Sequence, residues 1–216
     1  MRLYPDIGRM KLGNSTPFPL LSTDLQWKYL LEHDPQGEGG KKLKLEGKEL
    51  MSVPRQLFAL EGLQVLEMSP ERKSCLRYSL DFIPHEIGHL RNLTLLYLDS
   101  NNLKDVPVEI GLLIKLERLT LSNNNLTFLT IPDAIHQLQK LETLLLLFNS
   151  LKHLPRGICS LKTLTTLWLG HNKLEELPSS FGQLVHLDWV FIFSPSHPKG
   201  DSGRITLHIS GKHSMP

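Results

Sequence analysis

The residues best suited to carry chemistry are the five from His85 to His89, which read His-Glu-Ile-Gly-His. On an α-helix, two histidines four positions apart face one side and can bind a zinc ion, while the glutamate between them serves as a general base. Glu109 follows 20 positions after His89, near where some zinc peptidases place a third ligand. Taken alone, this spacing predicts a zinc metallopeptidase.

The flanking sequence gives the same residues a simpler explanation. Residues 84–90 have a copy at 107–113, in which Val108 and Leu112 take the places of the two histidines. Glu109 is then the copy of the motif's own glutamate, so its distance from the motif follows from a repeat in the chain. A segment that repeats with apolar residues at the histidine positions is typical of a structural turn, with those positions facing outward.

Other catalytic patterns are also missing. The longer zinc-protease pattern continues with a glycine and a third histidine, but Asn92 and Leu95 stand at those places. The sequence contains no glycine-rich dinucleotide or phosphate loop and no nucleophile elbow. We therefore predict no catalytic residue, no metal ligand and no cofactor.

The turn segment belongs to a longer repeat, which must position any functional side chain. The unit that begins at Leu93 reads Leu-x-x-Leu-x-Leu-x-x-Asn-x-Leu, followed by Val106-Pro107 and Ile110. The same frame returns, with near-regular spacing, at Leu116, Leu141 and Leu164. Residues 40–62 and the unit from Leu63 fit with departures, and a partial unit starts at Leu187. Repeats of this length predict a stack of similar coils.

Each part of the unit has a physical role. The Leu-x-Leu pair alternates like a strand that buries every second side chain. The asparagine turns the chain, and its amide can satisfy main-chain groups inside the bend, so stacked copies predict a ladder. This structural ladder comprises Asn101, Asn124, Asn149 and Asn172. Proline then starts a short helical turn whose apolar residues, three apart, point inward.

These motifs resemble the leucine-rich-repeat superfamily over roughly residues 40–194. The second half of the unit, (Ile/Leu/Val)-Pro-x-x-(Ile/Leu/Phe)-x-x-Leu, is similar to the intracellular Ras-suppressor and Scribble-like group. The resemblance implies an α/β fold: a right-handed solenoid with a concave parallel β-sheet and short helical or 3-10 turns on the convex side. It also implies binding to another protein, with small GTPases or signalling complexes as candidate partners.

The chain divides into three parts. Residues 1–39 form an N-terminal extension, in which 23–31 read as a short amphipathic helix that caps the first coil. Residues 40–194 hold six repeats and a partial seventh. Residues 195–216 form a polar tail that we expect to be flexible, although 204–209 alternate like a strand.

Composition narrows the function further. The 216 residues carry a formal net charge of +2 with both signs interspersed, which does not favour nucleic-acid binding. No apolar run has the length of a membrane span, and residues 1–11 have no signal-peptide core. We therefore expect a cytoplasmic protein, with the nucleus as the open alternative.

The frame also predicts where a partner binds. Residues at the third, fifth, seventh and eighth places of each unit should emerge on the concave side. In the later units many of them are apolar or aromatic, which is typical of interaction surfaces. The predicted partner-binding residues are Leu95, Tyr97, Arg118, Leu145, Leu147, Phe148, Trp168, His171, Trp189 and Phe191. The competing interpretation is that the tail folds back over Trp168, Trp189, Phe191 and Phe193.

The sequence thus favours a non-enzymatic scaffold or adaptor for another protein. A structural protein of cytoskeletal or ciliary assemblies would use the same face and is the main alternative. The zinc metallopeptidase remains the distant third. A shortened form of a longer protein is a fourth interpretation, because the repeats stop abruptly at Ser194.

Overall fold

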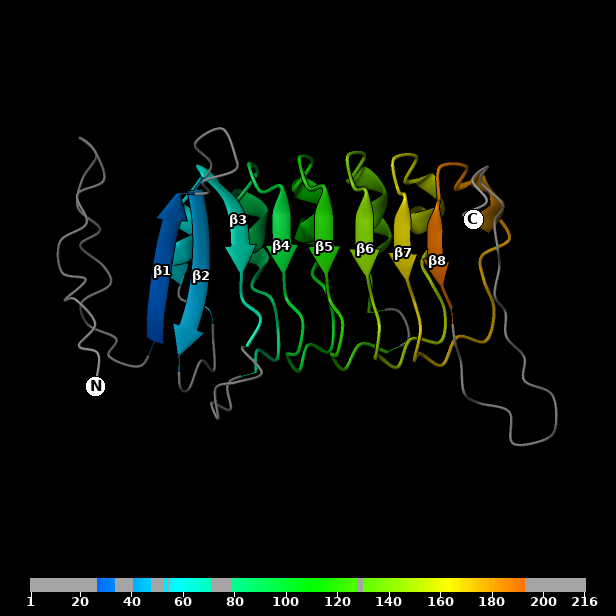
Figure 1. Cartoon of the computed structure of the whole chain (residues 1–216), viewed down its shortest axis with the longest axis horizontal. Helices are drawn as coiled ribbons and strands as arrows, with labels where there is room; N and C mark the ends of the chain where they lie inside the picture. The colour runs from blue at the N-terminus through cyan, green and yellow to red at the C-terminus, as the bar shows by residue number, and fades with distance from the viewer. Residues whose placement is uncertain are drawn as a thin grey trace, which may run out of the picture.

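The structure is a computed structural model that describes residues 27–33, 41–47, 53, 55–70, 79–127 and 130–192. Strands alternate with 3-10 helices along most of this part of the chain (Figure 1). In order they are β1 (Trp27–His33), β2 (Lys41–Gly47), η1 (Arg55–Ala59), β3 (Leu63–Glu67), η2 (His85–His89), β4 (Leu95–Tyr97), η3 (Val108–Leu112), β5 (Arg118–Thr120), η4 (Asp133–Gln137), β6 (Thr143–Leu145), η5 (Arg156–Ser160), β7 (Thr166–Trp168), η6 (Phe181–Gln183) and β8 (Trp189–Phe191).

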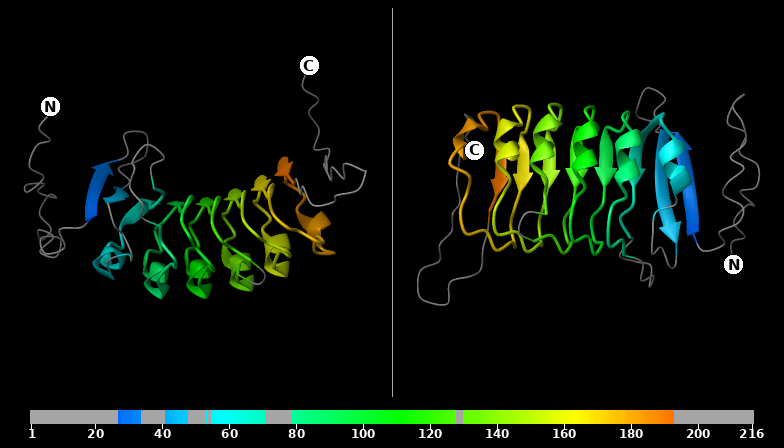
Figure 2. Two further views of the ribbon diagram at one scale, coloured as in Figure 1. Left: turned by 90° about the horizontal axis from the view of Figure 1, so that it is seen from below. Right: turned by 180° about the vertical axis from the view of Figure 1, so that it is seen from behind.

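The strands form one open sheet in chain order, and β2 to β8 are parallel. The repeat frame sets the register, because Leu96 pairs with Leu119, Leu119 with Leu144, and Leu144 with Leu167. The strands lie on the inner side of a shallow arc and the 3-10 helices on its outer side (Figure 2). The structure therefore confirms the predicted solenoid.

The core lies between the sheet and the turns, and it is built almost entirely from the repeated leucines and isoleucines. Leu144 and Leu146 on the sheet side are completely buried, as are Ile158 and Leu161 in the turn that follows. The same positions are buried in the neighbouring coils. Because a single coil cannot enclose these side chains, each coil depends on its neighbours for burial.

The repeated asparagines bond the bend after each strand to its own coil and to the preceding coil. Asn149 Nδ2 donates to the carbonyl oxygens of Leu121, 3.0 Å away, and Leu146, 3.2 Å away. Its Oδ1 accepts from the main-chain N–H of Leu126 at 3.1 Å. Asn101, Asn124 and Asn172 make the same set of bonds in their own coils.

The N-terminal helix predicted at residues 23–31 is wrong where the structure describes it. Residues Trp27–His33 form β1, which pairs antiparallel with β2 from Trp27 opposite Gly47 to His33 opposite Lys41. The first parallel strand would otherwise leave a row of unpaired main-chain groups at the sheet edge, and pairing satisfies them. Residues 23–26 and the predicted tail at 195–216 lie outside the described residues.

Candidate functional site

The His-Glu-Ile-Gly-His segment forms η2 on the convex side, with Ile87 and Gly88 buried and both histidines exposed. A 3-10 helix has three residues per turn, so side chains four positions apart point in different directions and lose the shared face of an α-helix. His85 instead contacts the next coil, where its Nδ1 lies 2.7 Å from Glu109 Oε2. Among the described residues, no group of three or more His, Cys, Asp or Glu side chains could hold a metal ion.

We expect the His85–Glu109 pair to be visible in a titration. The hydrogen bond to Glu109, together with its negative charge, raises the pKa of His85, and the same bond lowers the pKa of Glu109. His85 therefore stays protonated to a higher pH than a free histidine. The pair contributes to stability below the ordinary histidine pKa, and this contribution disappears as the pH rises through the raised value.

The NMR titration of the His85 imidazole checks this expectation. Glu109→Gln should return the pKa of His85 close to its ordinary value. Glu86→Gln should change it less, because Glu86 acts on His85 only through space. Equal effects of the two substitutions would show that the contact with Glu109 is not the main cause.

The concave face changes in character along the solenoid. Its first coils are polar: Lys42 and Lys44 form ion pairs with Glu67. Asp99 accepts hydrogen bonds from the Thr120 hydroxyl and from the main-chain N–H of Ser122. Burial raises the pKa of Asp99, although both bonds act to lower it. The polar groups of this half of the face are thus largely engaged with one another.

The later coils present apolar and aromatic side chains instead. Phe148 is 52% exposed, Trp168 40%, Trp189 66% and Phe191 48%. The core does not require these side chains, since the leucines already fill it. We call the exposed set formed by Phe148, Trp168, Trp189 and Phe191 the aromatic surface.

Phe148 has an unusual main-chain conformation within this surface. Its φ is 54°, in the left-handed region, where the equivalent positions hold Ser100, Asn123 and His171. Asparagine tolerates this region, whereas a bulky aromatic residue there is strained by about 1–3 kcal/mol. The ring stacks on His171, with the two centroids 4.2 Å apart and the planes 8° from parallel. A strained residue held in a defined contact at the surface is typical of a functional position.

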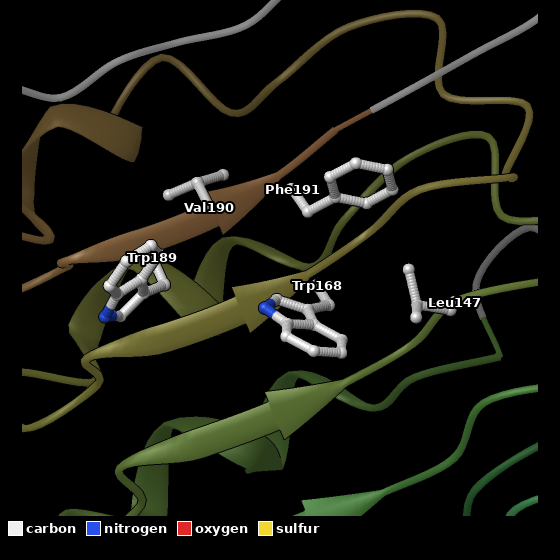
Figure 3. A pocket seen from close by; sticks show the side chains of 5 residues that line it. All are labelled: Leu147, Trp168, Trp189, Val190 and Phe191. Carbon is white, nitrogen blue, oxygen red and sulfur yellow. The ribbon is translucent and has the colours of Figure 1, made fainter.

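A shallow apolar hollow of about 330 Å³ lies at the C-terminal end of the aromatic surface. Leu147, Trp168, Trp189, Val190 and Phe191 line it (Figure 3). Gly170 lies against the Phe191 ring, because a Cβ at this position would collide with the ring. The preceding coil has Leu147 at the place of Gly170, so the glycine lets the Phe191 ring lie across the main chain.

The predicted partner-binding residues fall into two groups by exposure. Six are exposed: Arg118, Phe148, Trp168, His171, Trp189 and Phe191. Four are half-buried: Leu95, Tyr97, Leu145 and Leu147. Sequence reasoning missed Gly170 and Val190. The one indication for Gly170 in the sequence is that the equivalent position of the other units holds a larger residue: Asp99, Ser122 or Leu147.

Comparison with known proteins supports the repeat assignment. Residues 91–151 match a family model described as leucine rich repeat, and residues 163–184 match a second model of that description. No curated protein sequence matches the chain. Nothing in these matches tests the Scribble-like subgroup.

Several solved structures share the fold. The internalin inlF of Listeria monocytogenes is 20% identical with a TM-score of 0.54, and the match covers 66% of this chain and 38% of the internalin. The plant peptide hormone receptor RGFR1, solved in complex with RGF2, is 25% identical with a TM-score of 0.53 and coverages of 68% and 25%. Internalin C2 of L. monocytogenes is 24% identical, with a TM-score of 0.50 and coverages of 65% and 66%. The chain thus spans well under half of the first two proteins.

In the part of the chain that the structure describes, no helix has the length and apolar character to cross a bilayer.

Proposed function

We propose that this chain, a member of the leucine-rich-repeat superfamily, is a non-enzymatic scaffold that binds a partner protein on the C-terminal half of its concave face. Leucine-rich-repeat proteins in general mediate protein–protein interactions. The aromatic surface is the observation that carries the proposal here. A cytoplasmic adaptor role, with a signalling protein as partner, is part of the proposal.

The chemistry of this surface fits protein binding better than catalysis. Tryptophan and other aromatic residues dominate the binding energy of protein interfaces, where they bury a large area with few rotatable bonds. The hollow between β7 and β8 offers space for one apolar side chain of a partner. The Phe148 ring is exposed and stacks on His171.

Exposed apolar residues also occur away from the concave face, and they need a separate explanation. Among the described residues, Val108 and Leu112 in η3 are exposed in this way, as is Ile114, which follows η3. They are aliphatic, and scattered aliphatic side chains are common on protein surfaces. The convex group therefore provides a matched control rather than a second binding site.

The proposal is tested by substitutions that remove the aromatic surface and preserve the fold. Phe148→Asn introduces the residue that the preceding coil already has at this position, where Asn123 has a φ of 55°. Trp168→Ala and Leu145→Glu change outward-facing side chains on neighbouring strands. We expect each substitution to weaken partner binding by about tenfold or more, because interface hot spots contribute at least 1–2 kcal/mol. Quantitative proximity labelling followed by affinity measurement on the purified pair provides the readout.

Ile114→Glu is the matched control, since it places a charge at a convex side chain that is 58% exposed. A partner should survive this control and be lost with the concave variants. If every captured protein binds the three concave variants as well as the unmodified chain, while their circular dichroism is unchanged, the concave-face proposal is wrong. Loss with Ile114→Glu alone would place the interface on the convex side.

A further inference from the structure

Asp99 is a half-buried carboxylate on the concave face, and no ion pair among the described residues includes it. The completely buried Leu98 points into the core, so its neighbours Tyr97 and Asp99 face the concave side. Burial is the largest influence on the pKa of Asp99 and raises it, because the charged form has lost part of its water. A partly buried charge without a counter-charge is unfavourable, so a cation placed beside it would be stabilised.

The groups that bond to the carboxylate fix its position but are neutral. The Thr120 hydroxyl donates to Asp99 Oδ2 at 2.5 Å, and the Ser122 N–H donates to Asp99 Oδ1 at 2.7 Å. A carboxylate has about four acceptor positions, so these two bonds leave room for a further donor. An acceptor that is already held in place loses little conformational freedom when it binds such a donor.

The basic side chains of the same face do not supply this donor. Lys42 and Lys44 form ion pairs with Glu67. Arg118 in β5 is in register with the residue four positions before Asp99, which corresponds to about 13 Å along a strand. The charge of Asp99 is therefore not neutralised within the described part of the chain, and it remains available to a bound molecule.

Asp99 also lies within reach of the hollow. It has the same place in its unit as Leu147, which lines the hollow two coils further along. Neighbouring strands lie about 4.8 Å apart, so about 10 Å separates the two positions. An extended chain advances about 3.3 Å per residue, so a bound segment that crosses the strands covers this distance in about three residues.

We propose that the partner presents an arginine or lysine to Asp99 and an apolar side chain to the hollow, about three residues apart on an extended segment. The aliphatic part of the basic side chain lies along Tyr97, and its charged group donates to the carboxylate. A guanidinium can donate to both carboxylate oxygens at once, so arginine is favoured over lysine. This inference rests on the proposed function, because it specifies the partner of the same concave face.

Selection of a displayed library of random peptides on the purified full chain provides the probe. The selected sequences should combine a basic residue with an apolar residue about three positions away. Selection on Asp99→Asn should keep the apolar residue and lose the basic one. The variant should retain the fold, because asparagine can still accept from the Ser122 N–H and can donate to the Thr120 hydroxyl oxygen.

The affinity of one selected peptide measures the contact itself. Asp99→Asn should weaken its binding at least about tenfold, because a partly desolvated charge pair loses one member. Glu117→Gln is the matched control, since it removes the same charge from an exposed side chain next to β5 and should change binding by no more than about twofold.

A change in the peptide tests the pair from the other side, without relying on the fold of any variant. Replacing its basic residue by glutamine should weaken binding to the unmodified chain by the same factor as Asp99→Asn. The two changes together should weaken binding little more than either alone, because each removes the same contact.

Three results would overturn the contact with Asp99. The first is selected peptides that carry apolar residues without a basic one, which would leave the proposed function intact. The second is an equal effect of Asp99→Asn and Glu117→Gln, which would indicate a general attraction to negative charge. The third is the absence of any enriched peptide, which would also count against the proposed function. Peptides that require Asp99 but bind Trp168→Ala unchanged would support the basic contact and contradict a role of the aromatic surface.

Discussion

Asn149→Ala is expected to lower the free energy of unfolding by about 2–3 kcal/mol, since it leaves the buried Leu126 N–H without a partner, at about 1–3 kcal/mol, and removes one of two side-chain donors from each of two carbonyl oxygens. Asn124 and Asn172 remain as the other donors to these carbonyls. The affected groups are the carbonyls of Leu121 and Leu146 and the N–H of Leu126. They belong to two successive coils, so the substitution weakens a junction as well as a single bend. Urea unfolding followed by circular dichroism measures the loss.

Two further variants separate hydrogen bonding from packing at this position. Asn149→Asp keeps the acceptor for Leu126 but loses both donors and places a charge beside two carbonyl oxygens. It should therefore destabilise at least as much as alanine. Asn125→Ala changes an exposed side chain, while the main-chain bond from Asn125 to Leu103 remains, so we expect a change within about 0.5 kcal/mol. A stable Asn149→Asp variant would exclude the donor role.

The repeat made the solenoid predictable from sequence, because each half of the unit has its own spacing of apolar residues. The spacing of two belongs to the strand side, and the spacing of three belongs to the turn side. Leu-x-Leu alternation predicts a strand, and the apolar pair that follows proline predicts an inward-facing turn; Leu144, Leu146, Ile158 and Leu161 are buried accordingly. The N-terminal strand was not predictable in this way. Its sequence lies outside the repeat and contains helix-capping residues, and only the free edge of β2 favours a strand at 27–33.

The repeat predicted on which side of the sheet the candidate site residues lie, but it did not predict their contacts or main-chain conformations. The frame placed Trp168 and Phe191 on the concave side, where the structure has them exposed. It could not indicate that Phe191 lies across Gly170, because that contact depends on a ring conformation between coils. It also could not indicate the strain at Phe148, since the left-handed main chain becomes recognisable only when Ser100 and Asn123 are compared with it in space.

The glycines of the convex turns carry information that the sequence frame alone did not provide. Gly88 and Gly111 occupy equivalent positions, each directly after the buried isoleucine of its turn, whereas Gly157 lies directly before Ile158. A Cβ added at any of the three would meet the following or preceding coil too closely. The added atom would approach the Leu112 side chain at Gly88 and the Ala134 carbonyl oxygen at Gly111. Gly88 and Gly111 thus allow η2 to approach η3, and η3 to approach η4.

Gly157→Ala is the sharpest test of this requirement, and we expect it to lower the free energy of unfolding by about 3 kcal/mol. The new methyl group would collide with the main-chain carbonyl of Asp133, and it would disturb the 2.7 Å hydrogen bond from the Gly157 N–H to Asp133 Oδ1. The coils cannot separate freely, because β6 and β7 remain paired on the opposite side. Overpacking of this kind costs about 1–3 kcal/mol, and a fixed main-chain neighbour places it at the upper end.

Gly182 in the last described turn supplies the control, because it also neighbours the buried apolar residue of its turn, Phe181, and an added Cβ would meet nothing within 4 Å. Gly182→Ala should leave stability unchanged or raise it by up to about 1 kcal/mol, since alanine restricts the unfolded chain more than glycine. Urea unfolding of both variants measures the difference. Equal losses would mean that both turns need glycine for its main-chain conformation rather than for space. A loss confined to Gly157→Ala would mean that the close contact with Asp133 of the preceding coil requires glycine at residue 157.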